Sequence, residues 1–149
     1  MPLNPFSIHS TLLARHAQHV VLIHFPVALF TTSVAFDFLS RWMRRPALKT
    51  AAYLNLLIAA ASTIPVICTG LLAWQWQLEG QKLKGILRAH LVLALISTCL
   101  IWLVLWLQTH ARRQQKLTTP AFILLTESIA LMVLALTAHL GGFLSGVST

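Results

Sequence analysis

Residues 20–39 of this chain read VVLIHFPVALFTTSVAFDFL, and this stretch decides the fold. At about 1.5 Å per residue, a helix of this length crosses the roughly 30 Å hydrocarbon core of a bilayer. Three further apolar runs of similar length follow at about residues 50–74, 89–109 and 120–140. A bilayer requires every backbone polar group to be bonded internally, so these lengths favour helices over barrel strands. The sequence predicts an all-α, polytopic membrane protein.

The composition supports this prediction and limits the architecture. Hydrophobic residues make up 57% of the 149 residues and charged residues only 9%, too few to cover the surface of a soluble domain. The connections between the runs are short, so we expect an antiparallel bundle of four transmembrane helices within a single membrane domain, residues 1–149. The spacing of the runs hints at two helical hairpins, without convincing sequence similarity between the halves.

Basic residues between the runs predict the orientation. The formal charge is +8, but no basic face interleaved with aromatic residues appears, which argues against nucleic acid and leaves the lipid bilayer as the expected partner. The first and third connections carry Arg41, Arg44, Arg45, Lys49, Arg112, Arg113 and Lys116. The opposite side carries Arg15, Lys82, Lys84 and Arg88. The positive-inside rule therefore predicts a multi-pass protein of the bacterial inner membrane with both termini in the periplasm.

Histidines recur near the outer ends of three runs. His24 lies near the start of the first, His90 opens the third and His139 closes the fourth, so each lies within one to two turns of the same membrane face. His19 lies just above them, at the mouth. Ionisable residues in membrane segments indicate function, and facing helices of a bundle can hold a cofactor. The sequence predicts a cofactor site near the periplasmic face.

Imidazole chemistry leaves several interpretations of this site open. The first is haem b with two axial histidines, His90 and His139 being the expected pair, while the third histidine bonds a propionate or a quinone. Such a protein would exchange electrons with a quinone, a periplasmic redox protein or other subunits of a membrane complex. The second is a single copper, iron or zinc ion held by His24, His90 and His139. The third is a non-catalytic membrane subunit whose histidines bridge helix ends. No set of residues identifies an enzymatic reaction.

Polar residues also occur in the inner halves of the runs. Asp37 and Arg41 are spaced i, i+4, which predicts an interfacial ion pair. Glu127 lies well inside the fourth run, and we expect a protonated carboxyl that hydrogen-bonds between helices, a proton path being the alternative. At the outer end, Gly141-Gly142 predict the end of the fourth helix, or room for a flat ring beside His139.

The same residues resemble a known family. The chain contains His19, then His24-Phe25-Pro26-Val27-Ala28-Leu29, Asp37, Thr69-Gly70 before Trp74, His90, and Thr137-Ala138-His139-Leu140-Gly141-Gly142. This pattern, over about residues 19–147, is similar to the DUF2231 family of predicted bacterial membrane proteins. Val20, Ala73 and Phe143 depart from the family pattern. Some relatives carry cytochrome c or Rieske-type iron–sulfur domains, and the resemblance implies by analogy a setting in electron transfer.

Overall fold

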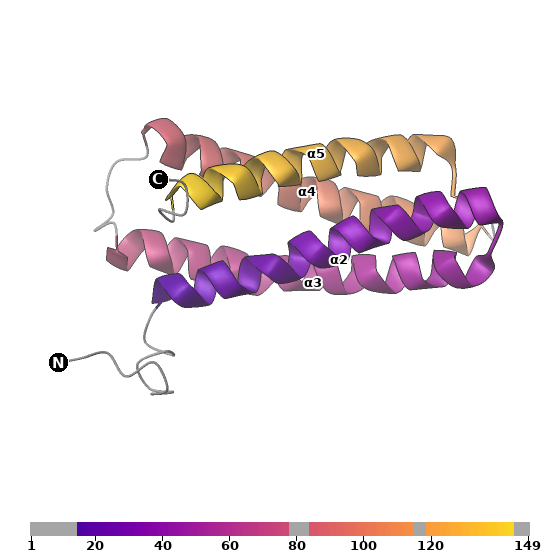
Figure 1. Cartoon of the computed structure of the whole chain (residues 1–149), viewed down its shortest axis with the longest axis horizontal. Coiled ribbons are helices and arrows are strands. Elements are labelled where there is room, and N and C mark those ends of the chain that lie inside the picture. Colours follow the sequence, from indigo (N-terminus) through magenta and orange to yellow (C-terminus); the bar gives the residue numbers. More distant parts are fainter. Residues whose placement is uncertain (1–14, 78–83, 115–118, 145–149) are drawn as a thin grey trace.

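The chain forms a bundle of long antiparallel helices. In a computed structural model, residues 15–77, 84–114 and 119–144 are described, and they form four helices and no strand. Lys82 and Lys116, used above for the orientation, lie outside these residues. The helices are α2 (Arg15–Met43), α3 (Pro46–Gln77), α4 (Gly85–Arg113) and α5 (Ala121–Leu144), arranged as in Figure 1. All four are long and apolar enough to cross a membrane, which confirms the predicted fold class.

Most of the helices extend beyond the apolar runs. Polar residues at a membrane interface can continue a helix after the hydrophobic stretch ends, so α2 begins five residues before the predicted position 20 and ends at Met43. The helix α5 runs through Gly141 and Gly142 to Leu144, so the prediction that these glycines end it is wrong. In the turn between α2 and α3, Arg44 adopts a left-handed φ of 53°. Pro46 then occupies the first helical position, which needs no N–H donor.

The packing reveals two equivalent hairpins. The helix α2 packs along α3, and α4 along α5, while the hairpins meet through α2 with α5 and α3 with α4. Asp37 and Gln108 are 71 residues apart, and the same separation relates every buried residue of α2 to a buried residue of α4. The buried residues of α2 are Pro26, Phe30, Ser33, Val34, Asp37 and Ser40, and those of α4 are Ser97, Ile101, Val104, Leu105, Gln108 and Ala111. The hairpin repeat that the sequence hinted at is therefore present in the packing.

The second helix of each hairpin follows the same register. Four buried positions of α3 correspond to four of α5: Ala52 with Ile123, Leu56 with Glu127, Ala59 with Ala130, and Thr63 with Leu134. Since α2 and α4 run in the same direction, the hairpins are parallel repeats related by rotation about the long axis of the bundle. Equivalent residues therefore lie at the same level of the bundle.

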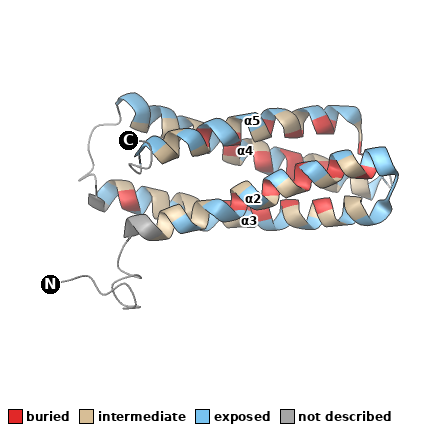
Figure 2. Cartoon of the chain, viewed as in Figure 1, coloured by how far each residue is buried: buried red, intermediate tan, exposed pale blue. Residues whose placement is uncertain are grey.

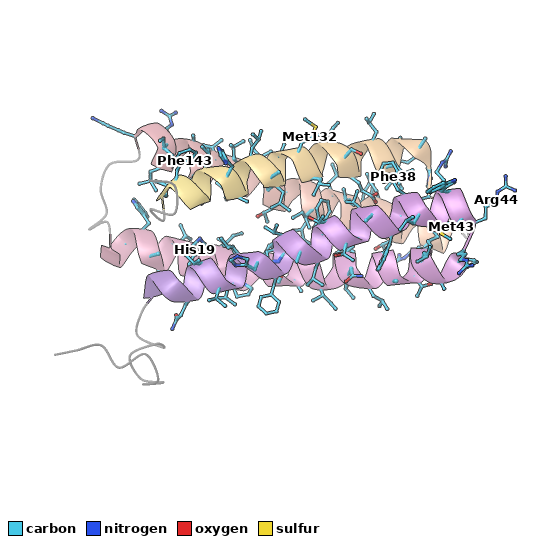
Figure 3. All side chains as sticks on the ribbon, viewed as in Figure 1. His19, Phe38, Met43, Arg44, Met132 and Phe143 are labelled. Carbon is cyan, nitrogen blue, oxygen red and sulfur yellow. The ribbon has the colours of Figure 1, made fainter. Side chains whose placement is uncertain are left out.

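The core is concentrated at one end. We call the end at which α2 and α4 begin the histidine end, and the other, which includes Arg41, Arg44 and Arg113, the arginine end; Figure 3 shows His19 and Arg44 toward opposite ends. Most buried residues lie in the central part and toward the arginine end (Figure 2), where Phe30 and Leu56 are fully buried. At the histidine end, residues 18–25 and 85–96 contain no buried side chain. The two hairpins are therefore packed together less completely there.

Candidate functional site

His19 is held by the neighbouring helix of its own hairpin. Its Nδ1 lies 3.2 Å from the Thr69 hydroxyl oxygen on α3. The single hydroxyl proton of Thr69 is directed at backbone carbonyls of α3, the nearest being that of Pro65 at 2.8 Å. Thr69 must therefore accept the hydrogen bond, and Nδ1 of His19 must donate it. This tautomer places the lone pair on Nε2, the nitrogen that would ligate a metal.

His90 is also held by the neighbouring helix of its own hairpin, but through a backbone carbonyl. Its Nδ1 lies 3.0 Å from the backbone carbonyl oxygen of Thr137 on α5. A carbonyl can only accept, so Nδ1 carries the proton and Nε2 carries the lone pair. The Thr137 hydroxyl in turn lies 2.9 Å from that of Ser97, one heptad along α4 from His90. Both histidines are thus fixed in the tautomer used for ligation through Nε2.

Each of these imidazoles lies directly against a glycine of the paired helix. A Cβ atom added to Gly70 would approach Cε1 of His19 to 2.9 Å, and one added to Gly141 would approach Cε1 of His90 to 3.1 Å. The first distance is closer than real Cβ atoms come, and the second is tighter than most. Gly142, next in the chain, would meet nothing within 4 Å. Gly70 and Gly141 therefore leave the space that the two imidazoles use.

His19 and His90 occupy equivalent positions of the two hairpins. They are separated by the same 71 residues as Asp37 and Gln108, and Gly70 and Gly141 share this separation. Each histidine lies one heptad before a buried residue of its helix, His19 before Pro26, so both continue the stripe that faces the bundle interior. Both are half-buried. Two Nε2 lone pairs thus come from equivalent helices at one level.

His24 and His139 lie elsewhere at the histidine end. Both side chains are exposed. His24 donates from Nδ1 to the backbone carbonyl of Val20 on its own helix at 2.7 Å. His139 packs edge-on against Phe143, with ring centroids 4.9 Å apart. Neither follows the buried stripe of its helix.

The structure therefore does not bring His24, His90 and His139 together as predicted. Within residues 15–77, 84–114 and 119–144, no three His, Cys, Asp or Glu side chains are placed to hold a metal ion. Of the four predicted histidines, His19 and His90 are the two related by the repeat. Each lies one heptad from a buried residue of its helix, a relation that becomes visible only once the buried positions are known.

A second polar cluster lies toward the arginine end, and we call Asp37, Gln108, Thr119 and Glu127 the acidic cluster. Gln108 donates from its amide nitrogen both to Asp37 Oδ2 and, at 2.6 Å, to Glu127 Oε1. The Thr119 hydroxyl donates to Asp37 Oδ1 at 2.9 Å. Asp37 is fully buried and Glu127 only 1% exposed. The carboxyls of α2 and α5 thus share one amide group from α4.

The predicted ion pair of Asp37 and Arg41 is replaced by these contacts. Arg41 is exposed, and its guanidinium donates to the backbone carbonyl of Thr119 at 3.0 Å instead. Asp37 faces the bundle interior because it continues the buried stripe of α2, whereas Arg41 reaches toward the surface. The expectation that Glu127 hydrogen-bonds between helices is confirmed by its bond to Gln108. Gln108 was overlooked in the sequence because it lies among apolar residues near the end of the third run.

One protein-family model matches nearly all of the chain that forms this four-helix arrangement. The model of a predicted membrane protein family, DUF2231, matches residues 15–147, which include both hairpins. The chain belongs to the DUF2231 family. Since the described part of the chain also contains four helices that could span a membrane, this DUF2231 protein is an integral membrane protein. No curated protein and no solved structure gives a significant match.

Proposed function

We propose that this DUF2231 protein is an electron-transfer protein in which His19 and His90 would hold a b-type haem between the two hairpins. The observation that carries the proposal is their equivalence. Both lie on the interior stripe at the same level, each held at Nδ1 by a threonine and each lying against a glycine. Two imidazoles at one level could hold a haem iron through Nε2, and their hydrogen-bonded Nδ1 atoms would fix the ring orientation and raise the basicity of Nε2.

The surroundings of the two histidines fit this cofactor. Among the described residues, the histidine end contains few buried side chains, so packing between the hairpins is weaker there than toward the arginine end. Apolar side chains of α2 and α4 surround this level and suit a porphyrin face, whereas Lys84 and Arg88 are exposed at the start of α4 and suit its propionates. Haem supplies one-electron transfer when bound.

The proposal changes the axial pair predicted from the sequence. His139 is exposed and packs on Phe143, so in this proposal His19 takes its place. His24 and His139 remain exposed at the same end, where an exchange partner would approach. Such a partner is a quinone in the bilayer, a periplasmic redox protein or a neighbouring subunit. His19 and His90 lie one to two helical turns from the membrane surface, a depth that partners in the bilayer and partners outside it can both approach.

An optical spectrum of the purified protein, oxidised and reduced, tests the proposal. We expect a Soret band that shifts on reduction, and the loss of this band in His19→Ala and in His90→Ala. His24→Ala and His139→Ala are matched controls, since each removes an exposed imidazole from the same end, and both should keep the wild-type spectrum. Loss of the band in a control, with retention in His19→Ala, would overturn the assignment of the axial pair.

Elemental analysis separates the alternatives. A colourless protein that contains stoichiometric copper, iron or zinc would indicate a metal ion in place of haem. A protein with neither a Soret band nor bound metal, after expression with ample haem precursor, would indicate a non-catalytic subunit. Either result would reject the proposed function.

A further inference from the structure

One buried oxygen of the acidic cluster has no hydrogen-bond partner among the residues that the structure describes. Glu127 is 1% exposed and points into the cluster, since its Oε1 accepts from Gln108 at 2.6 Å. Its other oxygen, Oε2, is buried, and no donor from the described parts of the chain reaches it. Most buried polar atoms in proteins have a hydrogen-bond partner, so an exception indicates a bound ligand or a proton in addition to the protein's own donors.

The donors available to the two carboxyls are limited. The Gln108 amide nitrogen has two hydrogens, and both carboxyls use it, while Thr119 adds one hydroxyl proton to Asp37. Because both carboxyls accept from the same Gln108 nitrogen, they lie next to each other. Two ionised carboxylates in contact repel each other, whereas a single proton between them converts the contact into a strong hydrogen bond.

The surrounding charges are consistent with one proton. The ammonium group of Lys49, on α3, attracts the carboxyl of Asp37, whereas Arg112 of α4 repels Lys49. On α2, the Arg41 guanidinium donates to the backbone carbonyl of Thr119. The charged group that α5 contributes to the cluster is Glu127 itself. The Arg112 guanidinium lies over the Tyr53 ring, 4.4 Å from its centroid. Lys49 thus favours one negative charge on the carboxyl pair, and a second negative charge would be buried within the membrane span at high cost.

We propose that Asp37 and Glu127 form a proton-binding site that holds one dissociable proton between their two carboxyl groups. The proton forms a hydrogen bond from one carboxyl to the other and satisfies Glu127 at its second oxygen. It exchanges with water at the arginine end, because Asp37 lies one helical turn from exposed Arg41 and bonds Thr119, to which Arg41 also donates. The site is distant from the histidine end and does not depend on haem.

The sequence makes this proposal unusually easy to test. The chain has only three acidic side chains, Asp37, Glu127 and Glu79, the last of which lies outside the described residues. Infrared spectroscopy of the purified full-length protein in lipid vesicles at neutral pH should show the C=O stretch of one protonated carboxyl, shifted in D₂O. Glu127→Gln and the double variant Asp37→Asn with Glu127→Gln should lose this band. Glu79→Gln is the matched control and should keep it.

A pH titration of the same band distinguishes a dissociable proton from a permanently neutral carboxyl. The band should decrease reversibly as the pH rises, and the ionised carboxylate bands should increase in proportion. Absence of the protonated band in the wild-type protein, its persistence in the double variant, or no change up to the pH at which the protein unfolds would overturn the proposal. Loss of the band on adding sodium in place of choline would instead indicate a cation site and would also overturn it.

Discussion

Asp37 of α2 and Gln108 of α4 hydrogen-bond to each other from equivalent positions of the two hairpins. Their helices are diagonal in the bundle, since each packs against α3 and α5. The bond therefore crosses the pseudo-symmetry axis, and the second bond of Gln108, to Glu127, reaches α5. A polar contact shared by three helices fixes how the hairpins are rotated against each other, which apolar packing in a lipid environment specifies less strictly.

Replacing Gln108 with Leu should destabilise the protein strongly. The substitution removes the amide that donates to both buried carboxyls, and hydrogen bonds to such groups contribute about 1.5–3 kcal/mol each. We expect a loss of roughly 3 kcal/mol in the free energy of unfolding, measured by chemical denaturation in detergent micelles. Gln114→Leu, at an exposed position just after α4, is the control and should change stability little. Equal effects of the two substitutions would contradict the bridging role of Gln108.

Adding a methyl group to Gly141 should disturb His90, whereas the same change at Gly142 should not. The new Cβ of Gly141→Ala would lie 3.1 Å from Cε1 of His90, so the imidazole must shift and weaken its bond to Thr137. We expect Gly141→Ala to cost about 1–2 kcal/mol of stability. Gly142→Ala should be neutral or stabilising by up to about 1 kcal/mol, because alanine favours the helix and nothing lies within 4 Å. Thermal unfolding of the two variants provides the comparison. A larger loss of stability in Gly142→Ala than in Gly141→Ala would contradict the contact between Gly141 and His90.

The excess of basic residues predicts that the histidine end faces the periplasm. In a background with Cys68 and Cys99 replaced by Ala, single cysteines at Lys84 and at Gln114 lie near opposite ends of α4. Intact bacterial cells treated with a membrane-impermeant maleimide should label the cysteine at position 84 and leave the one at 114 unlabelled. Permeabilised cells should label both, which controls for reactivity. Labelling at position 114 alone in intact cells would reverse the orientation.

The sequence could have yielded more of the site than its polar residues first indicated. Depth in the membrane follows directly from position along a run, so the levels of His24, His90 and His139 were predictable. The direction of each side chain around its helix could not be read from the sequence, and the structure places His19, but not His139, on the interior stripe of its helix. The repeat of 71 residues, visible once the buried positions are known, relates His19 to His90 and Asp37 to Gln108. Identical residues are rare in this register, which explains why the sequence alone did not reveal it.

The sequence by itself determined the number, the length and the succession of the membrane helices, because a bilayer requires apolar runs of a set length with internally bonded backbones. It also brought the beginnings of α2 and α4 to the same end of the bundle. Only the tertiary structure decided which side chains face one another. The rotation of each helix depends on packing against its neighbours, and this rotation placed Asp37 on Gln108 and His19 against Gly70.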